Sequence, residues 1–253
     1  MKRQNFTLAE LIVSAIPLLA MALMLPALYA KSVTETTVTA CMNNQKQISI
    51  ALYAYAPAYG DHAPYVDYEL GKGGSNATRV TWASALSSGQ FLKDNASYFC
   101  PAAAPLFKGT LGEQRSRMNG TETCISQPQK YLERYRFINY GINHEYIAGN
   151  FGSWHSGNAK ELVTMKLADI KNPAGKIMAA DAWNGGETNS FGRHLISGNI
   201  VSNRSNRINP CHGGSAVILW SDGHVTLQEK PNEIIQKGDA ATIRHYFNAT
   251  KGE

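Results

Sequence analysis

Hydrophobic and polar residues divide the chain into an apolar N-terminal segment and a more mixed remainder. Residues 2–5 are polar and include two basic side chains, residues 6–10 contain one acid, and residues 11–30 carry no charge. As a helix this uncharged run would be about 30 Å long, enough to cross the hydrocarbon core of a bilayer. The pattern predicts a transmembrane helix with its membrane span at about 11–30.

The helical pattern continues beyond the uncharged run. Four apolar residues recur at helical spacing with polar residues between them: Met42, Ile48, Leu52 and Tyr55. Because the residue before a proline disfavours helical backbone, the helix is expected to end near Ala56 and Pro57. We therefore predict one long helix over residues 6–56 and a globular domain over residues 57–253.

The clearest strand pattern lies near the C-terminus. Residues 216–220 form an uninterrupted apolar run, as in a strand that is buried on both faces. The dipeptide Asp222-Gly223 favours a type I′ hairpin turn, and apolar residues resume at Val225. The sequence thus predicts an α+β fold, in which a long N-terminal transmembrane helix packs on a C-terminal antiparallel β-sheet domain with long loops.

Charge and composition narrow the classes of partner. The formal net charge is +5 with no cluster of Lys and Arg, so a nucleic-acid-binding surface is not predicted. The basic residues precede the apolar run and the domain follows it, and the positive-inside rule then exports the domain. The expected localisation is the bacterial inner membrane, with a single pass and a periplasmic or extracellular C-terminal domain.

The chain has four cysteines, Cys41, Cys100, Cys124 and Cys211. An even number in an exported domain is compatible with two disulfides in three alternative pairings, and free buried thiols are the alternative. No pair of Cys or His residues has the sequence spacing typical of a zinc finger, so no metal site is assigned from spacing.

The segment Phe6-Thr7-Leu8-Ala9-Glu10, after a short basic leader, resembles the N-terminal signal of type IV prepilins and type II secretion pseudopilins. The resemblance implies a leader peptide over residues 1–5. It also implies cleavage between Asn5 and Phe6, N-methylation of Phe6, and an assembly role for Glu10. Asn5 stands where that family usually has glycine. A plain membrane anchor and a secretory signal peptide are the alternatives.

Nine residues separate His212 from Asp222-Gly223. This spacing resembles the H-x9-DG signature of a large bacterial pseudopilin-like family with prepilin-type processing, which implies a pilin-like fold. Four shorter matches extend the resemblance: the Cys41 helix, Cys100-Pro101, Tyr140-Gly141-Ile142-Asn143 and Asn172-Pro173.

Two interpretations of the H-x9-DG segment stay open. In the first, His212, Asp222 and His224, with Asp181 as a further candidate, hold a metal or a polar ligand. In the second, Asp222 and Gly223 form the turn and His212 caps a loop. Calcium is considered because some pseudopilins bind it near their C-terminal sheet, although this region offers few acids.

Two functional hypotheses follow. The first is a pilin-like structural subunit, assembled through its N-terminal helix into a type II secretion pseudopilus or a type IV pilus-like filament. Its partners would be a prepilin peptidase/N-methyltransferase, other pilin-like subunits, the inner-membrane assembly platform and the membrane. The second is a membrane-tethered binding module for a glycan or surface ligand. Neither hypothesis is enzymatic, because the sequence contains no nucleophile elbow, P-loop or paired-histidine zinc motif.

Overall fold

The structure is a computed structural model, and it describes residues 8–70, 78–103, 135, 138–149, 164–184, 191–198 and 206–250. The cleavage and methylation positions Asn5 and Phe6 lie outside the described residues, as does Cys124. Glu10 lies within a described helix, but its side chain is outside the described part of the chain.

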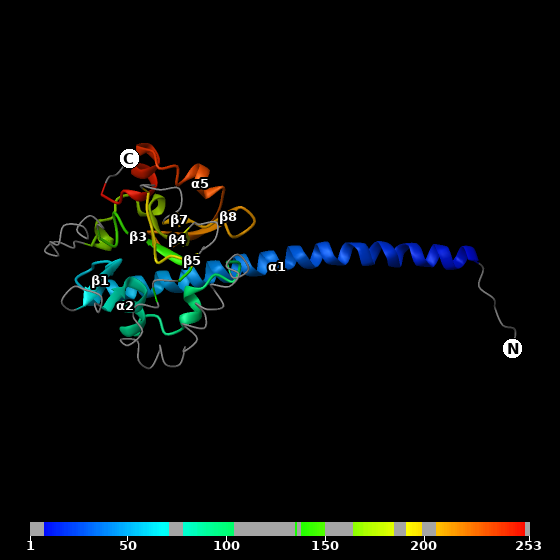
Figure 1. Cartoon of the computed structure of the whole chain (residues 1–253), viewed down its shortest axis with the longest axis horizontal. Coiled ribbons are helices and arrows are strands. Elements are labelled where there is room, and N and C mark those ends of the chain that lie inside the picture. Colours follow the sequence, from blue (N-terminus) through cyan, green and yellow to red (C-terminus); the bar gives the residue numbers. More distant parts are fainter. Residues whose placement is uncertain are drawn as a thin grey trace. The chain divides into compact units, whose positions relative to one another are not determined.

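The first element is the helix α1, Leu8–Ala58, with 51 residues (Figure 1). The chain divides into two units, Met1–Thr37 and Val38–Glu253. The first unit contains the N-terminal part of α1, and its described side chains include Ile16, which is 61% exposed. The second unit contains the rest of α1 together with all described strands.

For the described residues, the prediction of a transmembrane helix is wrong. None of the helices in that part of the chain is long and apolar enough to cross a membrane. The same finding overturns the predicted single-pass inner-membrane localisation.

Seven of the described strands form one sheet in the second unit. Five of them follow the order β6-β3-β4-β8-β9, while β5 and β7 pair with β4. Their bounds are β3 Tyr140–Asn143, β4 Ile177–Asn184, β5 Phe191–Gly192, β6 Leu195–Ile196, β7 Arg207–Ile208, β8 Ser215–Trp220 and β9 Val225–Glu229. A separate antiparallel pair is formed by β1 Asp67–Leu70 and β2 Thr78–Thr81.

The predicted purely antiparallel sheet is wrong, because β3 and β6 pair in parallel while the other pairs of this sheet are antiparallel. A parallel pair needs a long connection, and the chain between β3 and β6 includes the whole of β4. Local sequence carries no signal for such a pairing, since the partner strand β6 has only two residues.

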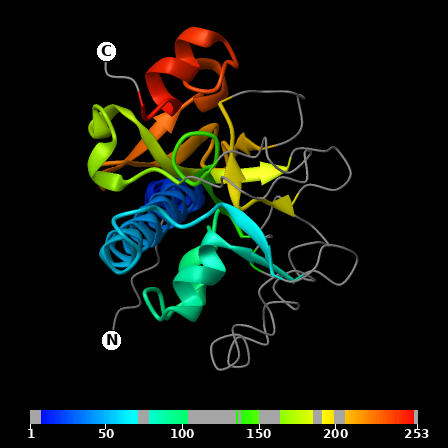
Figure 2. The same ribbon diagram turned by 90° about the vertical axis from the view of Figure 1, so that its left-hand side faces the viewer.

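Short helices cover the sheet on both faces. On the side of α1 lie α2 Trp82–Ser88 and the 3-10 turn η1 Asn95–Tyr98, and Figure 2 shows α2 on the opposite side of the sheet from the C-terminal helices. The remaining segments are η6 Leu167–Asp169, η7 Pro173–Gly175, α5 Pro231–Ile234, α6 Ala240–Thr242 and the π-helical turn η8 Ile243–Phe247.

The predicted burial of β8 on both faces is confirmed, because all six of its residues are buried. Val217 and Leu219 belong to the hydrophobic core that includes α1 and α2. Ala216, Ile218 and Trp220 point the other way and pack with Phe247 and other residues of the C-terminal segment. This alternation is the two-residue period of a strand with a core on each side.

The turn after β8 differs from the predicted type I′ turn. Gly223 has a φ of +88°, but Asp222 is not among the residues with positive φ, whereas a type I′ turn requires two such residues. The Gly223 N–H donates to the carbonyl of Trp220 at 2.9 Å, and the Trp220 N–H donates to the carbonyl of His224 at 3.0 Å. This is a type I turn followed by a left-handed glycine, the usual three-residue hairpin loop.

Within the second unit, the C-terminal part of α1 packs against this hairpin. The side-chain amide of Gln45 donates to the carbonyl of Val217 at 2.9 Å, and Lys46 Nζ donates to the carbonyl of Gly223 at 2.7 Å. Tyr53 donates to the carbonyl of Ser221. Gln45, which the sequence pattern places among the polar positions, is therefore buried.

Candidate functional site

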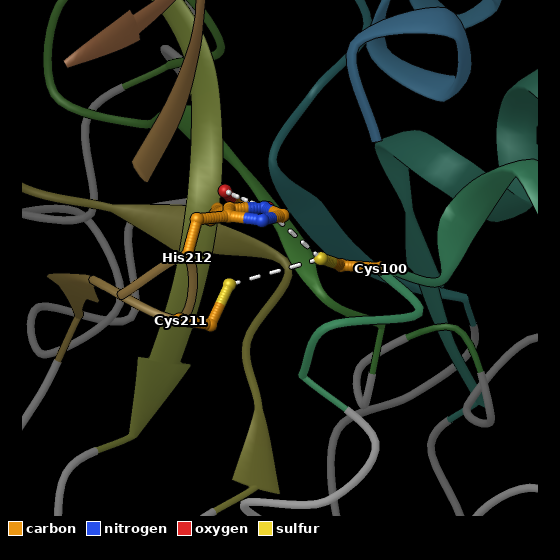
Figure 3. Close-up of side chains that lie close together, drawn as sticks. Cys100, Cys211 and His212 are labelled. Atoms are coloured by element: carbon orange, nitrogen blue, oxygen red, sulfur yellow. Dashed lines mark hydrogen bonds and ion pairs between the residues drawn. The ribbon is translucent and has the colours of Figure 1, made fainter. Parts of the chain in front are cut away.

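Four side chains that can bind a metal converge in the second unit: Cys100, Asp181, Cys211 and His212. Cys100 follows η1, Asp181 lies within β4, and Cys211 and His212 precede β8. Figure 3 shows the sulfur atoms of both cysteines and the ring of His212 turned toward one another. One ligand atom from each of the four residues lies within 4.8 Å of all the others.

Three contacts define the cluster. The Sγ atoms of Cys100 and Cys211 are 3.7 Å apart, and Cys100 Sγ lies 3.4 Å from His212 Nε2. His212 Nε2 in turn lies 3.3 Å from Asp181 Oδ2. Cys100, Asp181 and His212 are buried, and Cys211 is partly exposed.

A tight turn places His212 at the start of β8. Gly213 and Gly214 have φ of +63° and +93°, which glycine adopts without steric cost. The His212 N–H donates to the carbonyl of Ser215 at 3.0 Å, and the Ser215 N–H donates back to His212 at 3.2 Å. Because these bonds close the turn at both ends, the backbone beside the cluster is fixed.

The positions of Cys100 and Asp181 are set by the sheet. The Cys100 N–H donates to the side-chain oxygen of Asn139 at 3.1 Å, and the Asn139 carbonyl accepts from Ala182 beside Asp181. Asp181 Oδ2 accepts a hydrogen bond from the Val217 N–H at 2.7 Å. The carboxylate thus bridges β4 and β8, which pair directly.

Charge in the cluster is only partly compensated by the described residues. Burial raises the pKa of Asp181, and the hydrogen bond from His212 opposes this effect. Burial disfavours the charged form of His212, but hydrogen bonds to Asp181 and Cys100 outweigh it and raise the pKa of the imidazole. Asp181 Oδ1 and His212 Nδ1 are buried without a hydrogen-bond partner among the described residues.

The thiols of the cluster are held in the neutral form. Burial is the main cause that raises the pKa of Cys100 to about 12. Cys41, from α1, lies beside Cys100 and His212, and a hydrogen bond to Cys100 together with burial raises its pKa. The described cysteines Cys41, Cys100 and Cys211 are free thiols. No disulfide joins any two of these three residues, and Cys124 lies outside the described part of the chain.

The structure brings together only part of the predicted H-x9-DG site. Asp222 and His224 lie beyond the other end of β8, a strand of six residues, or about 20 Å from the cluster at 3.3 Å per residue. They are partly exposed and pair with each other, and His224 stacks on Trp220. His212 and Asp181 do meet. The sequence analysis did not connect these two residues to Cys100 and Cys211. The one sequence signal for this contact was that Cys211 and His212 are neighbours in the chain.

A second buried polar cluster lies elsewhere in the same unit. His194 Nε2 is 3.1 Å from Asp67 Oδ2, and both side chains are buried. His144 is also buried, and burial together with the charge of His194 lowers its pKa to about 4, although Asp67 partly opposes the shift. His144 is therefore a buried group in the core whose protonation depends on pH.

We expect the domain to lose stability as the pH falls from about 6.5 toward about 4. Unfolding returns the pKa of His144 from about 4 to its usual 6.5, so the unfolded chain binds the proton more readily and acid favours unfolding. Between pH 7 and pH 5 the loss due to His144 should be about 2 kcal/mol. Urea unfolding at both pH values should show a smaller loss in His144→Gln.

The exposed His245 supplies the control for this measurement. His245→Gln should keep the acid sensitivity of the unchanged protein. The expectation would be wrong if His144→Gln and the unchanged protein lost the same free energy of unfolding between the two pH values.

Comparisons of the chain with protein-family models, with curated proteins and with solved structures find no match. The resemblance to prepilins and to the H-x9-DG family therefore depends on the motifs in the sequence.

Proposed function

We propose that the chain is a structural subunit of a pilin-like filament, either a secretion pseudopilus or a type IV pilus-like fibre. A prepilin peptidase/N-methyltransferase would cut before Phe6, and copies of the chain or related subunits would assemble through their N-terminal helices. The observation that supports this proposal most is the length of α1, which extends from Leu8 to Ala58. At 1.5 Å per residue it would be about 77 Å long.

The two parts of α1 differ in their packing. Beyond Thr37 the helix contributes Cys41, Ile48 and Leu52 to the core of its own domain. The first unit contains no described element besides α1, although residues 11–30 are uncharged and mostly apolar. An apolar helix gains free energy by burying its surface, and the helices of other subunits would provide that burial.

Charge supplies a mechanism for ordered assembly. Cleavage before Phe6 would create a new α-amino group, and Glu10 is the one acid among residues 1–30. A carboxylate in an apolar helix bundle is costly without a partner. Pairing of Glu10 with the Phe6 amine of a neighbouring subunit would remove that cost and set the register between subunits.

We expect Glu10→Ala to lower the assembled fraction at least about tenfold, because loss of one partner leaves the other buried charge unpaired. The full-length chain would be co-expressed with a prepilin peptidase, and filaments would be quantified by sedimentation and electron microscopy. Mass spectrometry of the N-terminal peptide should find N-methylated Phe6. The melting curve of the domain should not change.

Glu35 provides a matched control, since it is an exposed acid on the same helix. Glu35→Ala should assemble normally. Filaments of unchanged yield from Glu10→Ala would contradict the pairing mechanism. An N-terminus that remains at Met1 in the assembled protein would contradict processing, and a processed chain that stays monomeric would favour a binding module instead.

A further inference from the structure

The spacing of the four ligand atoms at Cys100, Asp181, Cys211 and His212 fits a tetrahedral metal site. With metal–sulfur, metal–nitrogen and metal–oxygen bonds of about 2.3, 2.05 and 2.1 Å, the edges of the tetrahedron would be about 3.8 Å for S–S, 3.6 Å for S–N and 3.4 Å for N–O. The three measured contacts are 3.7, 3.4 and 3.3 Å. The other three pairs of ligand atoms lie within 4.8 Å of each other, so a movement of about 1 Å would place one ion among the four atoms.

The chemistry of the donors selects the metal. Two thiols, one imidazole and one carboxylate are the ligand types that Zn²⁺ takes in proteins, whereas calcium and magnesium prefer oxygen ligands. All four positions would come from the protein, as in structural zinc sites, with no position left for a substrate. A role in stability is therefore more consistent with the donors than a role in catalysis.

Burial and charge also favour a cation. Asp181 is 1% exposed, and its Oδ1 atom has no partner among the described residues. His212 and the Val217 N–H both contact Oδ2, and a cation at the cluster would add to the compensation of this buried charge. On binding, the two thiols and the protonated imidazole of His212 would release their protons to solvent. The resulting thiolates and neutral imidazole, with the Asp181 carboxylate, would surround the divalent ion.

We propose that Cys100, Asp181, Cys211 and His212 bind one zinc ion that joins three separate parts of the domain. The ion would connect the segment after η1, the middle of β4 and the turn before β8. Cys41 lies next to two of these ligands, so the site also contacts the C-terminal part of α1. The ion thereby stabilises the packing of α1 on its own domain, independently of whether the chain forms filaments.

Metal analysis of the full-length protein, purified under reducing conditions, tests the proposal. Elemental mass spectrometry should find about one zinc per chain, and removal by a chelator should lower the melting temperature until zinc is restored. Co²⁺ added to the metal-free protein should give the visible bands of a tetrahedral site and a thiolate-to-cobalt charge-transfer band. Cys100→Ser and His212→Gln should each weaken zinc binding at least about 100-fold.

Two variants serve as controls. Asp222→Asn changes the other acid of the H-x9-DG segment, which pairs with His224 away from the cluster, and should keep full zinc affinity. Cys41→Ser changes a buried thiol that contacts Cys100 and His212 but is not one of the four ligands, and should weaken zinc binding less than Cys100→Ser does.

Three results would overturn the proposal. The first is no binding of zinc or Co²⁺ by the reduced, folded protein. The second is a Cys100–Cys211 disulfide in protein taken directly from cells. The third is undiminished zinc affinity in folded Cys100→Ser. If the ligand variants fail to fold, the Co²⁺ spectrum of the unchanged protein decides, because a spectrum without thiolate charge transfer contradicts coordination by the two cysteines.

Discussion

Replacement of Gly141 by valine is expected to lower the free energy of unfolding by about 4 kcal/mol or more. Gly141 lies in β3 between β4 and β6. A Cβ atom at this position would lie 2.6 Å from the carbonyl carbon of Leu195 and 2.8 Å from its oxygen. Since these are backbone atoms of β6, a side-chain rotation cannot relieve the overlap and the strand must move.

Equilibrium urea unfolding, followed by circular dichroism, would measure this effect. Gly213→Ala is the control, because Gly213 has a φ of +63° and an added Cβ would meet nothing within 4 Å. It should cost only about 1–2 kcal/mol, the price of a left-handed conformation. Equal losses in Gly141→Val and Gly213→Ala would show that close packing of β6 on β3 is not the cause.

Replacement of Lys176 by methionine should destabilise the domain by about 3 kcal/mol. Lys176 is fully buried, and its Nζ donates to the carbonyl oxygens of Arg244 at 3.0 Å and His245 at 2.6 Å. Methionine keeps most of the side-chain volume but donates no hydrogen bond, so both carbonyls of the C-terminal segment lose a charged partner. The variant also avoids burial of an ammonium group, which keeps the loss below the sum of two such bonds.

Lys230 allows a matched comparison, because its side chain is 68% exposed and its contact with Glu233 is long, at 3.9 Å. Lys230→Met should change the free energy of unfolding by less than about 0.5 kcal/mol. Hydrogen exchange should show that the backbone amides of residues 243–248 lose protection in Lys176→Met first. Uniform loss over the whole sheet, or no loss at all, would contradict the role of this lysine in holding the C-terminal segment.

The motif Tyr140-Gly141-Ile142-Asn143 shows what a sequence pattern can and cannot indicate. It coincides with β3, which covers the same four residues. The structure adds why two of the residues are needed: Gly141 allows β6 to approach, and the side-chain amide of Asn143 donates to the carbonyls of Ile177 and Phe247. These contacts could not be predicted from the sequence, because β6, Ile177 and Phe247 all lie more than 30 residues further along the chain.

Sequence alone determined the features that depend on neighbouring residues. Side-chain periodicity and backbone preferences act within a few residues. They predict the apolar run of β8, the helical stripe at Ile48 and Leu52, and the position but not the type of the turn at Gly223. The leader motif with Glu10 is also a local pattern, and it supports the functional proposal together with the length of α1.

Only the tertiary structure decided which distant residues meet. It buried Gln45, paired β3 with β6 in parallel and separated Asp222 from His212. It also collected Cys100, Asp181, Cys211 and His212 around one point, from segments up to 112 residues apart. The physical reason is that burial and hydrogen bonding act on distances in space, and the packing of α1 and the strands sets those distances after local structure has formed.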